Sequence, residues 1–237
     1  MRNMRAVWVG ILAACCLAGS SGCSGETQAA LPPDPGSAAE PAVRTGYEDV
    51  ALVGNSYIDS FYIYDAVQGA AYYYRVGLNV ENAFELPMVQ GEDMQTPVLN
   101  LLEGKTPSHI FLFFGENELG WTNRDAFTDG YAEVIRATRG YCPEAAIYLC
   151  AIPPVSKAVS QENQDNTSNP SIRACNAEIQ KVAQENDAVY VDSFDALADA
   201  DGCLPADAAA DGIHPAKAYT ERWAELLKQS IAEVERK

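Results

Sequence analysis

Residues 50–57 read Val-Ala-Leu-Val-Gly-Asn-Ser-Tyr, an uninterrupted apolar run that ends in a glycine and two small polar residues. A continuous apolar run of this kind is typical of a strand buried on both faces, as in a parallel sheet covered by helices. The Gly54-Asn55-Ser56 segment that follows predicts a tight passage from the strand into a helix. Residues in this position lie at the carboxyl edge of an open α/β sheet, where ligands bind.

Further short apolar runs continue this pattern along the chain. With Val50–Val53 as the first strand, the others are Tyr72–Val76, Ile110–Phe114, Ala146–Ile152 and Ala188–Val191. The segments between them have helical periodicity. We therefore predict an α/β protein, a three-layer α/β/α sandwich around a five-stranded parallel sheet, with no internal repeat and no second domain.

Three of the intervening segments each carry a single apolar stripe, which predicts helices packed on the sheet. The first should open near Asn123, the second at Asn169-Pro170 and the last at Pro215. Their stripes consist of Phe127, Tyr131, Val134 and Ile135, then of Ile172, Cys175, Ile179, Val182 and Ala183, and finally of Tyr219, Trp223, Leu226, Leu227, Ile231 and Val234.

The segment 1–23 has the layout of an export signal. Arg2 and Arg5 precede the apolar run 6–18, which is shorter than the about 20 residues that span a membrane, and small residues lead up to Cys23. Bacterial lipoproteins receive their lipid on a cysteine that follows small residues. We expect attachment at Cys23, with Cys15 and secretion without lipid as the alternatives.

The segment 24–45 consists mostly of Pro, Ala, Gly, Ser and Glu, and it has too few large apolar side chains to order itself. We expect a disordered linker there, followed by one folded domain over 46–237. The protein is then expected outside the bacterial membrane, anchored through its lipid or secreted, and as a monomer.

Charge and cysteine content exclude several classes of function. A formal net charge of −17 opposes binding to nucleic acid, which requires clustered Lys and Arg. After the leader, Cys142, Cys150, Cys175 and Cys203 remain, either as buried thiols or in up to two disulfides whose pairing the spacing leaves open. With two histidines in the chain and no Cys-x-x-Cys after the leader, we expect no metal site and no cofactor.

Chemically versatile residues follow the predicted strands. Ser56 follows the first strand, Gly77 the second and Asn117 the third, whereas Asp211 and His214 lie just ahead of the last helix. A serine nucleophile needs a base that takes its proton, and the base needs a carboxylate that orients it. Taken singly, each of these residues also has an ordinary structural explanation as a helix cap or turn residue.

In this order the motifs resemble those of the SGNH, or GDSL-like, hydrolase family over nearly all of the chain after the linker. The family's Gly-Asp-Ser, glycine, Gly-x-Asn and Asp-x-x-His blocks correspond here to Gly54-Asn55-Ser56, Gly77, Gly115-Glu116-Asn117 and Asp211–His214. Asn55 stands where the family usually has Asp, and Glu118 stands where an Asp is common after the third block.

The resemblance implies a flavodoxin-like fold and a set of roles for these residues. Ser56 is the implied nucleophile, and His214 is the implied base, oriented by Asp211. The Ser56 N–H, the Gly77 N–H and the Asn117 side chain form the implied oxyanion hole.

The implied activity is hydrolysis of an ester through an acyl-enzyme. The expected substrate is an acylated small molecule or glycan of the cell envelope. The alternatives are hydrolysis of lipid or lysophospholipid esters, acyl transfer to another acceptor, and a binding protein that has lost catalysis. Tyr57 and Trp121 are the aromatic residues expected to line the substrate cleft.

Overall fold

One parallel sheet forms the centre of the domain. The computed structural model describes residues 46–89 and 93–236, so the predicted leader and linker lie outside the described residues. The sheet has the strand order β2-β1-β3-β4-β5, which is the flavodoxin-like order. Its strands are β1 (Val50–Gly54), β2 (Ala71–Tyr74), β3 (His109–Phe113), β4 (Ala146–Cys150) and β5 (Val189–Val191). The predicted fold class is confirmed.

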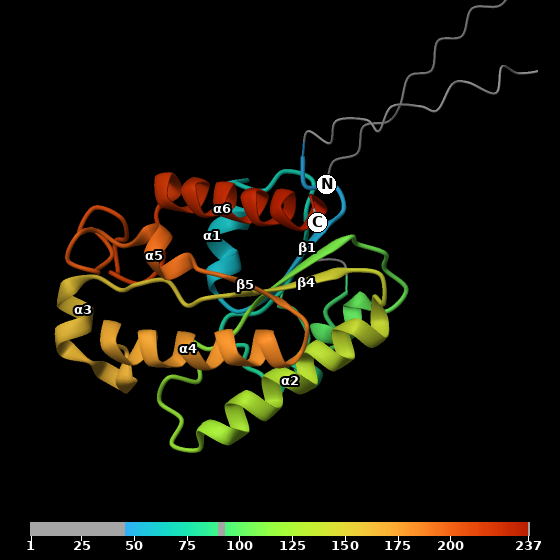
Figure 1. Ribbon diagram of the computed structural model, residues 1–237, viewed down its shortest axis with the longest axis horizontal. Helices are drawn as coiled ribbons and strands as arrows, with labels where there is room; N and C mark the ends of the chain where they lie inside the picture. The colour runs from blue at the N-terminus through green and yellow to red at the C-terminus, as the bar shows by residue number, and fades with distance from the viewer. Residues whose placement is uncertain (1–45, 90–92, 237) are drawn as a thin grey trace, which may run out of the picture. The chain divides into compact units, whose positions relative to one another are not determined.

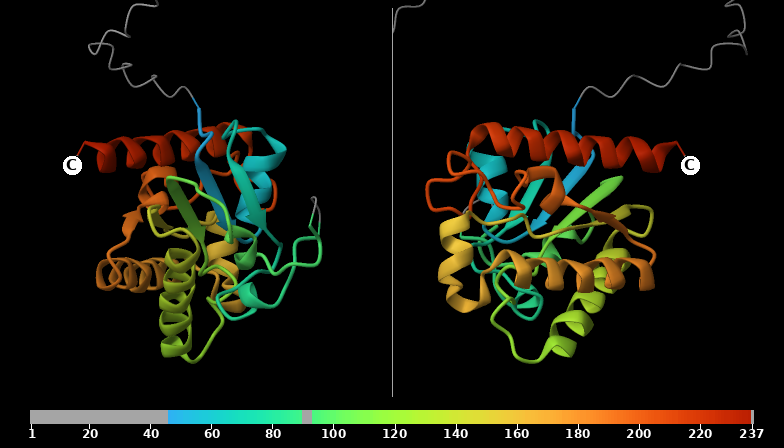
Figure 2. Two further views of the ribbon diagram at one scale, coloured as in Figure 1. Left: turned by 90° about the vertical axis from the view of Figure 1, so that its right-hand side faces the viewer. Right: turned by 60° about the vertical axis from the view of Figure 1, so that its left-hand side comes forward.

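Helices cover both faces of this sheet (Figures 1 and 2). One face carries α1 (Tyr57–Ile63) and α6 (Lys217–Glu235), and the other carries α2 (Arg124–Tyr141) and α4 (Asn169–Glu185). The shorter elements are α3 (Lys157–Glu162), α5 (Ser193–Leu197) and the 3-10 turns η1 (Asn82–Phe84), η2 (Leu99–Leu102) and η3 (Gln164–Asn166). Every residue of β1 and β3 is buried, as expected for strands covered on both sides. None of the helices within residues 46–89 and 93–236 combines the length and the apolar composition of a membrane-spanning segment.

Hydrogen bonds before the first helical turn explain where α2 and α6 begin. The Asn123 side chain accepts a hydrogen bond from the Ala126 N–H at 3.3 Å and opens α2 as predicted. The last helix begins at Lys217 and not at Pro215, so that predicted start is wrong. Ala216 stays extended because its N–H donates to the Ala208 carbonyl at 2.6 Å, which delays the first helical turn.

Two strands end two residues earlier than predicted, and β3 ends one residue earlier, at Phe113. β2 ends at Tyr74 and not at Val76, because the chain leaves this edge strand toward Gly77, which has a φ of +79°. β4 ends at Cys150 although the buried run continues through Val155. The apolar pattern alone does not reveal this second ending, because the residues after Cys150 remain in the core.

After β4 ends, two asparagines of α4 make the backbone hydrogen bonds that a neighbouring strand would otherwise make with this segment. The Asn176 side chain accepts from the Ile152 N–H at 2.8 Å and donates to the Ile152 carbonyl at 2.9 Å. Asn169 makes the same pair of bonds with Val155, at 2.8 and 2.9 Å. These side chains satisfy backbone groups that would otherwise be buried without partners. They hold the segment that leads to Ser156, which in turn contacts the turn containing Asp211 and His214.

The four cysteines after the predicted leader all carry free thiols. Cys142, Cys150 and Cys175 are buried, and Cys203 is half-buried. The spacing of the cysteines left both disulfides and unpaired thiols open, and the structure has unpaired thiols. Burial raises the pKa of the Cys150 thiol well above its usual value, which makes it a weak nucleophile.

Replacing Asn176 by Ala should destabilise the domain by roughly 3 kcal/mol, because both backbone groups of Ile152 lose their partner inside the core. Urea denaturation followed by circular dichroism measures this loss. Gln180→Ala is the matched control, since Gln180 is an exposed amide on the same helix and should change stability by less than about 0.5 kcal/mol. Equal stability of the two variants would contradict the role assigned to Asn176.

Candidate active site

Ser56 lies immediately after β1, at the start of α1. The turn depends on Gly54, because a Cβ added there would collide with the Phe113 carbonyl oxygen of the adjacent strand. Ser56 occupies the N-cap position of α1, yet its hydroxyl makes no capping hydrogen bond. Its Oγ instead lies 3.0 Å from His214 Nε2. The structure therefore favours a reactive role for this serine over the alternative of a helix cap.

His214 and Asp211 form the second link of the same chain of hydrogen bonds. The His214 Nδ1 lies 2.7 Å from Asp211 Oδ2, and Asp211 Oδ1 accepts the backbone N–H groups of Ile213 and His214 at 2.9 Å each. Partial burial acts to raise the pKa of Asp211, but the hydrogen bonds from His214 and Ile213 outweigh it and the net pKa is lowered. Asp211 thus remains a carboxylate, the form that orients an imidazole and stabilises its cation.

The turn that carries this pair is held from two sides. The Ser156 N–H donates to the Gly212 carbonyl at 2.8 Å, which ties the turn to the segment after β4. On the other side the Tyr57 ring lies 5.6 Å from the His214 ring and 5.6 Å from Trp223. We expected Tyr57 at the cleft wall, but it is only 3% exposed and packs against the His214 ring from inside the core.

Gly77 and Asn117 lie at the same edge of the sheet as Ser56. β1 pairs with β2 and β3 so that Gly54 is opposite both Tyr74 and Phe113, and the loops after the three strands therefore adjoin. The Asn117 side chain donates one N–H to the Leu78 carbonyl at 2.8 Å, which binds the third loop to the Gly77 loop. An amide has two N–H donors, so one of them is left to contact a substrate oxygen.

Glu118 supports both of these loops from inside the protein. Its side chain is fully buried, and it accepts the Val80 N–H and the Gly115 N–H at 2.9 Å each. Burial raises the pKa of Glu118 to about 7, although the two N–H donors lower it in part. One carboxyl group thus links the loop after β2 to the loop after β3.

Glu116 is a site residue that the sequence analysis did not single out. The Asn55 Nδ2 lies 3.5 Å from Glu116 Oε2, so a carboxylate from the third loop lies beside the position where the family usually has Asp. Burial raises the pKa of Glu116, His214 lowers it and Asp211 raises it, so its charge acts on the Asp211–His214 pair. The sequence signal that could have identified Glu116 was its carboxylate inside Gly115-Glu116-Asn117, together with the absence of a charge at Asn55.

A pocket of about 680 Å³ adjoins these residues. Its wall includes Asn117, Asp211 and Trp121, one of the two aromatic residues that we expected to line the substrate cleft. A second hollow of about 780 Å³ also contains Asp211, but its wall includes no residue of the loop after β3. The first pocket is therefore the one that a substrate held by Asn117 would enter. In the described ranges, no group of three or more His, Cys, Asp or Glu side chains is placed to hold a metal ion.

A serine, a histidine and a carboxylate linked in this order at the carboxyl edge of a parallel sheet form the site of a serine-type hydrolase. The sequence model of the GDSL-like lipase/acylhydrolase family matches residues 52–221, and the chain belongs to this family. It is accordingly an esterase or acylhydrolase.

Solved structures show the same fold at low sequence identity. A protein from Streptococcus pneumonia is 20% identical with a TM-score of 0.64, covering 79% of this chain and 86% of its own. A mutant of an acetyl-xylooligosaccharide esterase from Geobacillus Stearmophilus is 14% identical with a TM-score of 0.54, covering 77% and 93%. A peptidoglycan O-acetylesterase is 19% identical with a TM-score of 0.54, covering 70% and 47%. No curated protein matches the sequence.

The pKa of Glu118 predicts how stability depends on pH. Between the usual value of 4.5 and about 7, the folded protein keeps a proton that the unfolded chain has released. Stability therefore falls as pH rises through this window, by roughly 3 kcal/mol in total. Glu118→Gln removes this dependence, so urea denaturation from pH 4.5 to 7.5 should show a smaller decline in the variant than in the parent protein.

The exposed Glu133 on α2 provides the control for this measurement. Glu133→Gln removes the same charge from the surface and should keep the pH dependence of the parent protein. Parallel stability profiles for the parent and Glu118→Gln would show that the buried carboxyl does not titrate in this range.

Proposed function

We propose that the protein is an exported esterase that removes short acyl groups, above all acetyl, from hydroxylated small molecules or glycans. The observation that carries this proposal is the wall of the 680 Å³ pocket beside Asn117 and Asp211. Apart from Trp121, Val159 and Ile213, its side chains are mostly polar or charged. Such a wall suits a polyol, with an aromatic face for a sugar ring, better than a long acyl chain.

The proposed reaction begins at the Ser56–His214 hydrogen bond. His214 Nε2 takes the proton of Ser56 Oγ as the oxygen attacks the ester carbonyl, and Asp211 stabilises the resulting imidazolium. The carbonyl oxygen becomes an oxyanion, and in the proposed mechanism the second N–H of the Asn117 side chain and the backbone N–H groups of Gly77 and Ser56 bind it. The tetrahedral intermediate then expels the alcohol, which receives its proton from His214.

The same groups complete the second half of the cycle. A water molecule gives a proton to His214 and attacks the acyl-Ser56 carbonyl, and the collapse of the second intermediate returns the proton to Ser56 as the acid leaves. The fold shared with an acetyl-xylooligosaccharide esterase and a peptidoglycan O-acetylesterase supports acetyl esters as the substrates to examine first.

Activity against p-nitrophenyl acetate tests the proposed roles. Ser56→Ala should abolish turnover, and Asn117→Ala should lower kcat about 100- to 1000-fold because one oxyanion donor is lost. Thermal unfolding of both variants checks that the fold is retained. Turnover by Ser56→Ala at the rate of the parent protein would refute the mechanism.

A series of p-nitrophenyl esters tests the proposed acyl specificity. We expect kcat/KM to fall steeply from acetate to octanoate, because the polar pocket offers little apolar surface to a longer chain. A maximum at octanoate or longer would instead identify a lipid acylhydrolase.

We also propose that Cys23 carries the lipid anchor, on the grounds of the export-signal pattern in 1–23 and the small residues before this cysteine. In a bacterial host grown with labelled palmitate, the full chain should incorporate label and sediment with membranes. Cys23→Ala should lose both properties and Cys15→Ala should keep them. Loss of label and of membrane sedimentation in Cys15→Ala alone would identify Cys15 as the attachment site.

A further inference from the structure

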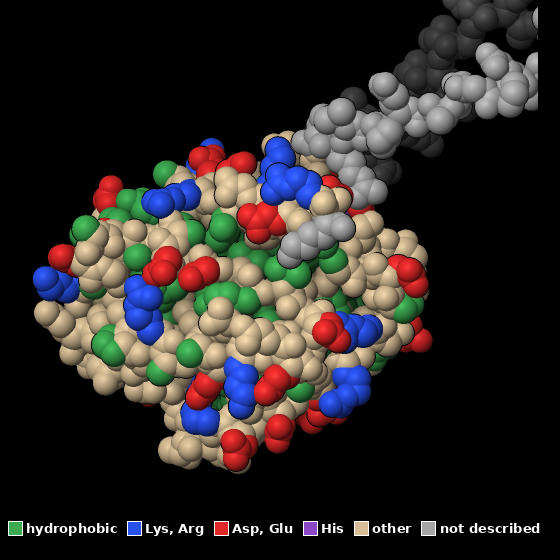
Figure 3. Space-filling view, in the orientation of Figure 1, with side chains coloured by type: hydrophobic (Ala, Val, Ile, Leu, Met, Phe, Trp, Pro, Cys, Tyr) green, Lys and Arg blue, Asp and Glu red, His purple; other side chains and the backbone are tan. Residues whose placement is uncertain are grey.

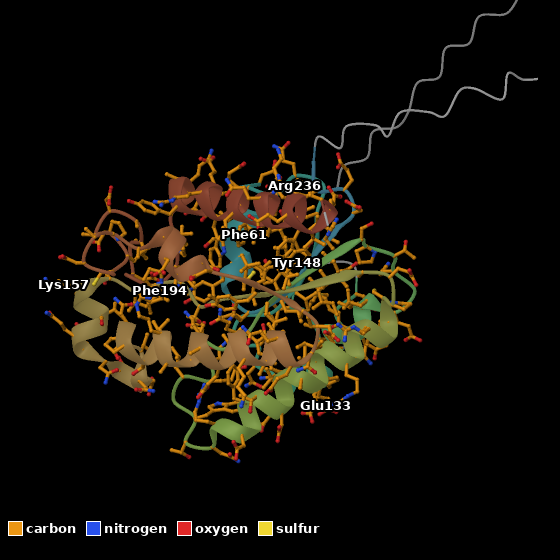
Figure 4. The ribbon with its side chains drawn as sticks, in the orientation of Figure 1. Phe61, Glu133, Tyr148, Lys157, Phe194 and Arg236 are labelled. Atoms are coloured by element: carbon orange, nitrogen blue, oxygen red, sulfur yellow. The ribbon has the colours of Figure 1, made fainter. Side chains whose placement is uncertain are left out.

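The charged side chains in the wall of the 680 Å³ pocket beside Asn117 and Asp211 are all negative. Its wall includes the carboxylates of Glu116, Glu162, Asp165 and Asp211. Among the described residues that line it, none is Lys or Arg. On the face drawn in Figure 3, by comparison, Lys and Arg are interspersed with Asp and Glu. Lys157, labelled in Figure 4, lines the neighbouring hollow instead.

The carboxylates come from separate segments that the fold joins around the pocket. Glu162 ends α3, and Asp165 lies in η3 directly after it. This segment is fastened to the loop after β3, because the Asn166 Nδ2 donates to the Leu119 carbonyl at 2.9 Å. A Cβ added to Gly120 would lie 3.5 Å from the Asp165 carbonyl oxygen, so the two segments are in close contact. The negative wall is thus a fixed part of the site.

A charged side chain acts strongly on a ligand only when the two are a few ångströms apart. The Debye length is about 10 Å at 0.1 M salt, so distant parts of a surface with a net charge of −17 contribute little inside the pocket. Carboxylates in the pocket wall interact with a bound group across a few ångströms of a partly enclosed site. They repel a ligand carboxylate or phosphate and attract an ammonium group.

We propose that this pocket selects the alcohol part of the ester by charge, accepting neutral and cationic alcohols and disfavouring those that carry a carboxylate or a phosphate. Glu162 and Asp165 are the specificity-determining residues, because they lie in the wall of the pocket but outside the Ser56–His214–Asp211 chain. The inference rests on the proposed function and adds the charge class of the substrate. It predicts that neutral or amino-bearing polyol acetates are hydrolysed in preference to acetates of acidic sugars.

A pair of acetate esters of equal shape tests this selectivity. Acetylcholine and 3,3-dimethylbutyl acetate differ in a quaternary nitrogen that replaces a carbon. Each is measured at pH 8 and low salt by its kcat/KM and by its competition against p-nitrophenyl acetate. We expect the cation to be favoured about tenfold, and we expect 0.5 M NaCl to reduce that ratio because it screens the carboxylates.

The Glu162→Gln/Asp165→Asn double variant should lower the cation-to-neutral ratio by about threefold or more. Asp129→Asn/Glu133→Gln is the matched control, since it removes the same charge from exposed positions on α2 and should keep the parent ratio. Glu133 lies on α2 away from α3, as Figure 4 shows. The comparison uses a ratio within each variant, so a general change in activity does not affect it.

The possible outcomes separate this inference from the function on which it rests. Hydrolysis of p-nitrophenyl acetate with equal use of the two matched esters, or a ratio that the double variant leaves unchanged, would overturn the charge selectivity alone. Failure to hydrolyse any acetate ester would overturn the proposed function and the selectivity together. A ratio that falls only in the Glu162→Gln/Asp165→Asn variant and with added salt supports the proposal.

Discussion

The hydrogen bond between Ser56 Oγ and His214 Nε2 joins two residues 158 positions apart, and the arrangement of the site depends on it. One end is set by β1, which lies between β2 and β3 and delivers Ser56 to the carboxyl edge of the sheet. The other end is set by the turn before α6, which Ser156 and Tyr57 hold in place. A bond of 3.0 Å tolerates little displacement at either end, so both supports are needed.

Buried polar side chains provide much of this support. Glu118 accepts backbone N–H groups from the loops after β2 and β3, and Asn169 and Asn176 pair with the backbone after β4. Each group is buried and has its hydrogen-bond partners, so it specifies one loop conformation without leaving an orphaned polar atom. The site is thus held by side chains that do not themselves contact the reacting atoms.

A carboxylate lies beside Asn55, the position where the family usually has Asp. Asn55 lacks the charge of the usual Asp, and Glu116 places a carboxylate beside it from the adjacent strand's loop. Glu116 is part of the pocket wall and interacts electrostatically with the Asp211–His214 pair. Together with Glu162 and Asp165, it makes the pocket wall negative, which the overall composition does not reveal.

The sequence by itself determined the strands, the long helices and the order of the motifs, because apolar periodicity and helix caps are properties of neighbouring residues. It placed Ser56, Gly77, Asn117 and the Asp211–His214 turn at loops, and the family resemblance supplied their roles. The sequence pattern misplaced the end of β4 and the start of α6. At these two points the backbone bonds to residues distant in the chain, Ile152 to Asn176 and Ala216 to Ala208. Only the tertiary structure decided which side chains meet: Tyr57 beneath His214, Glu116 beside Asn55, and Glu162 and Asp165 in one pocket wall. Contacts of this kind join residues far apart in the chain, and burial and distance then set their charge and reactivity, so no local pattern contains them.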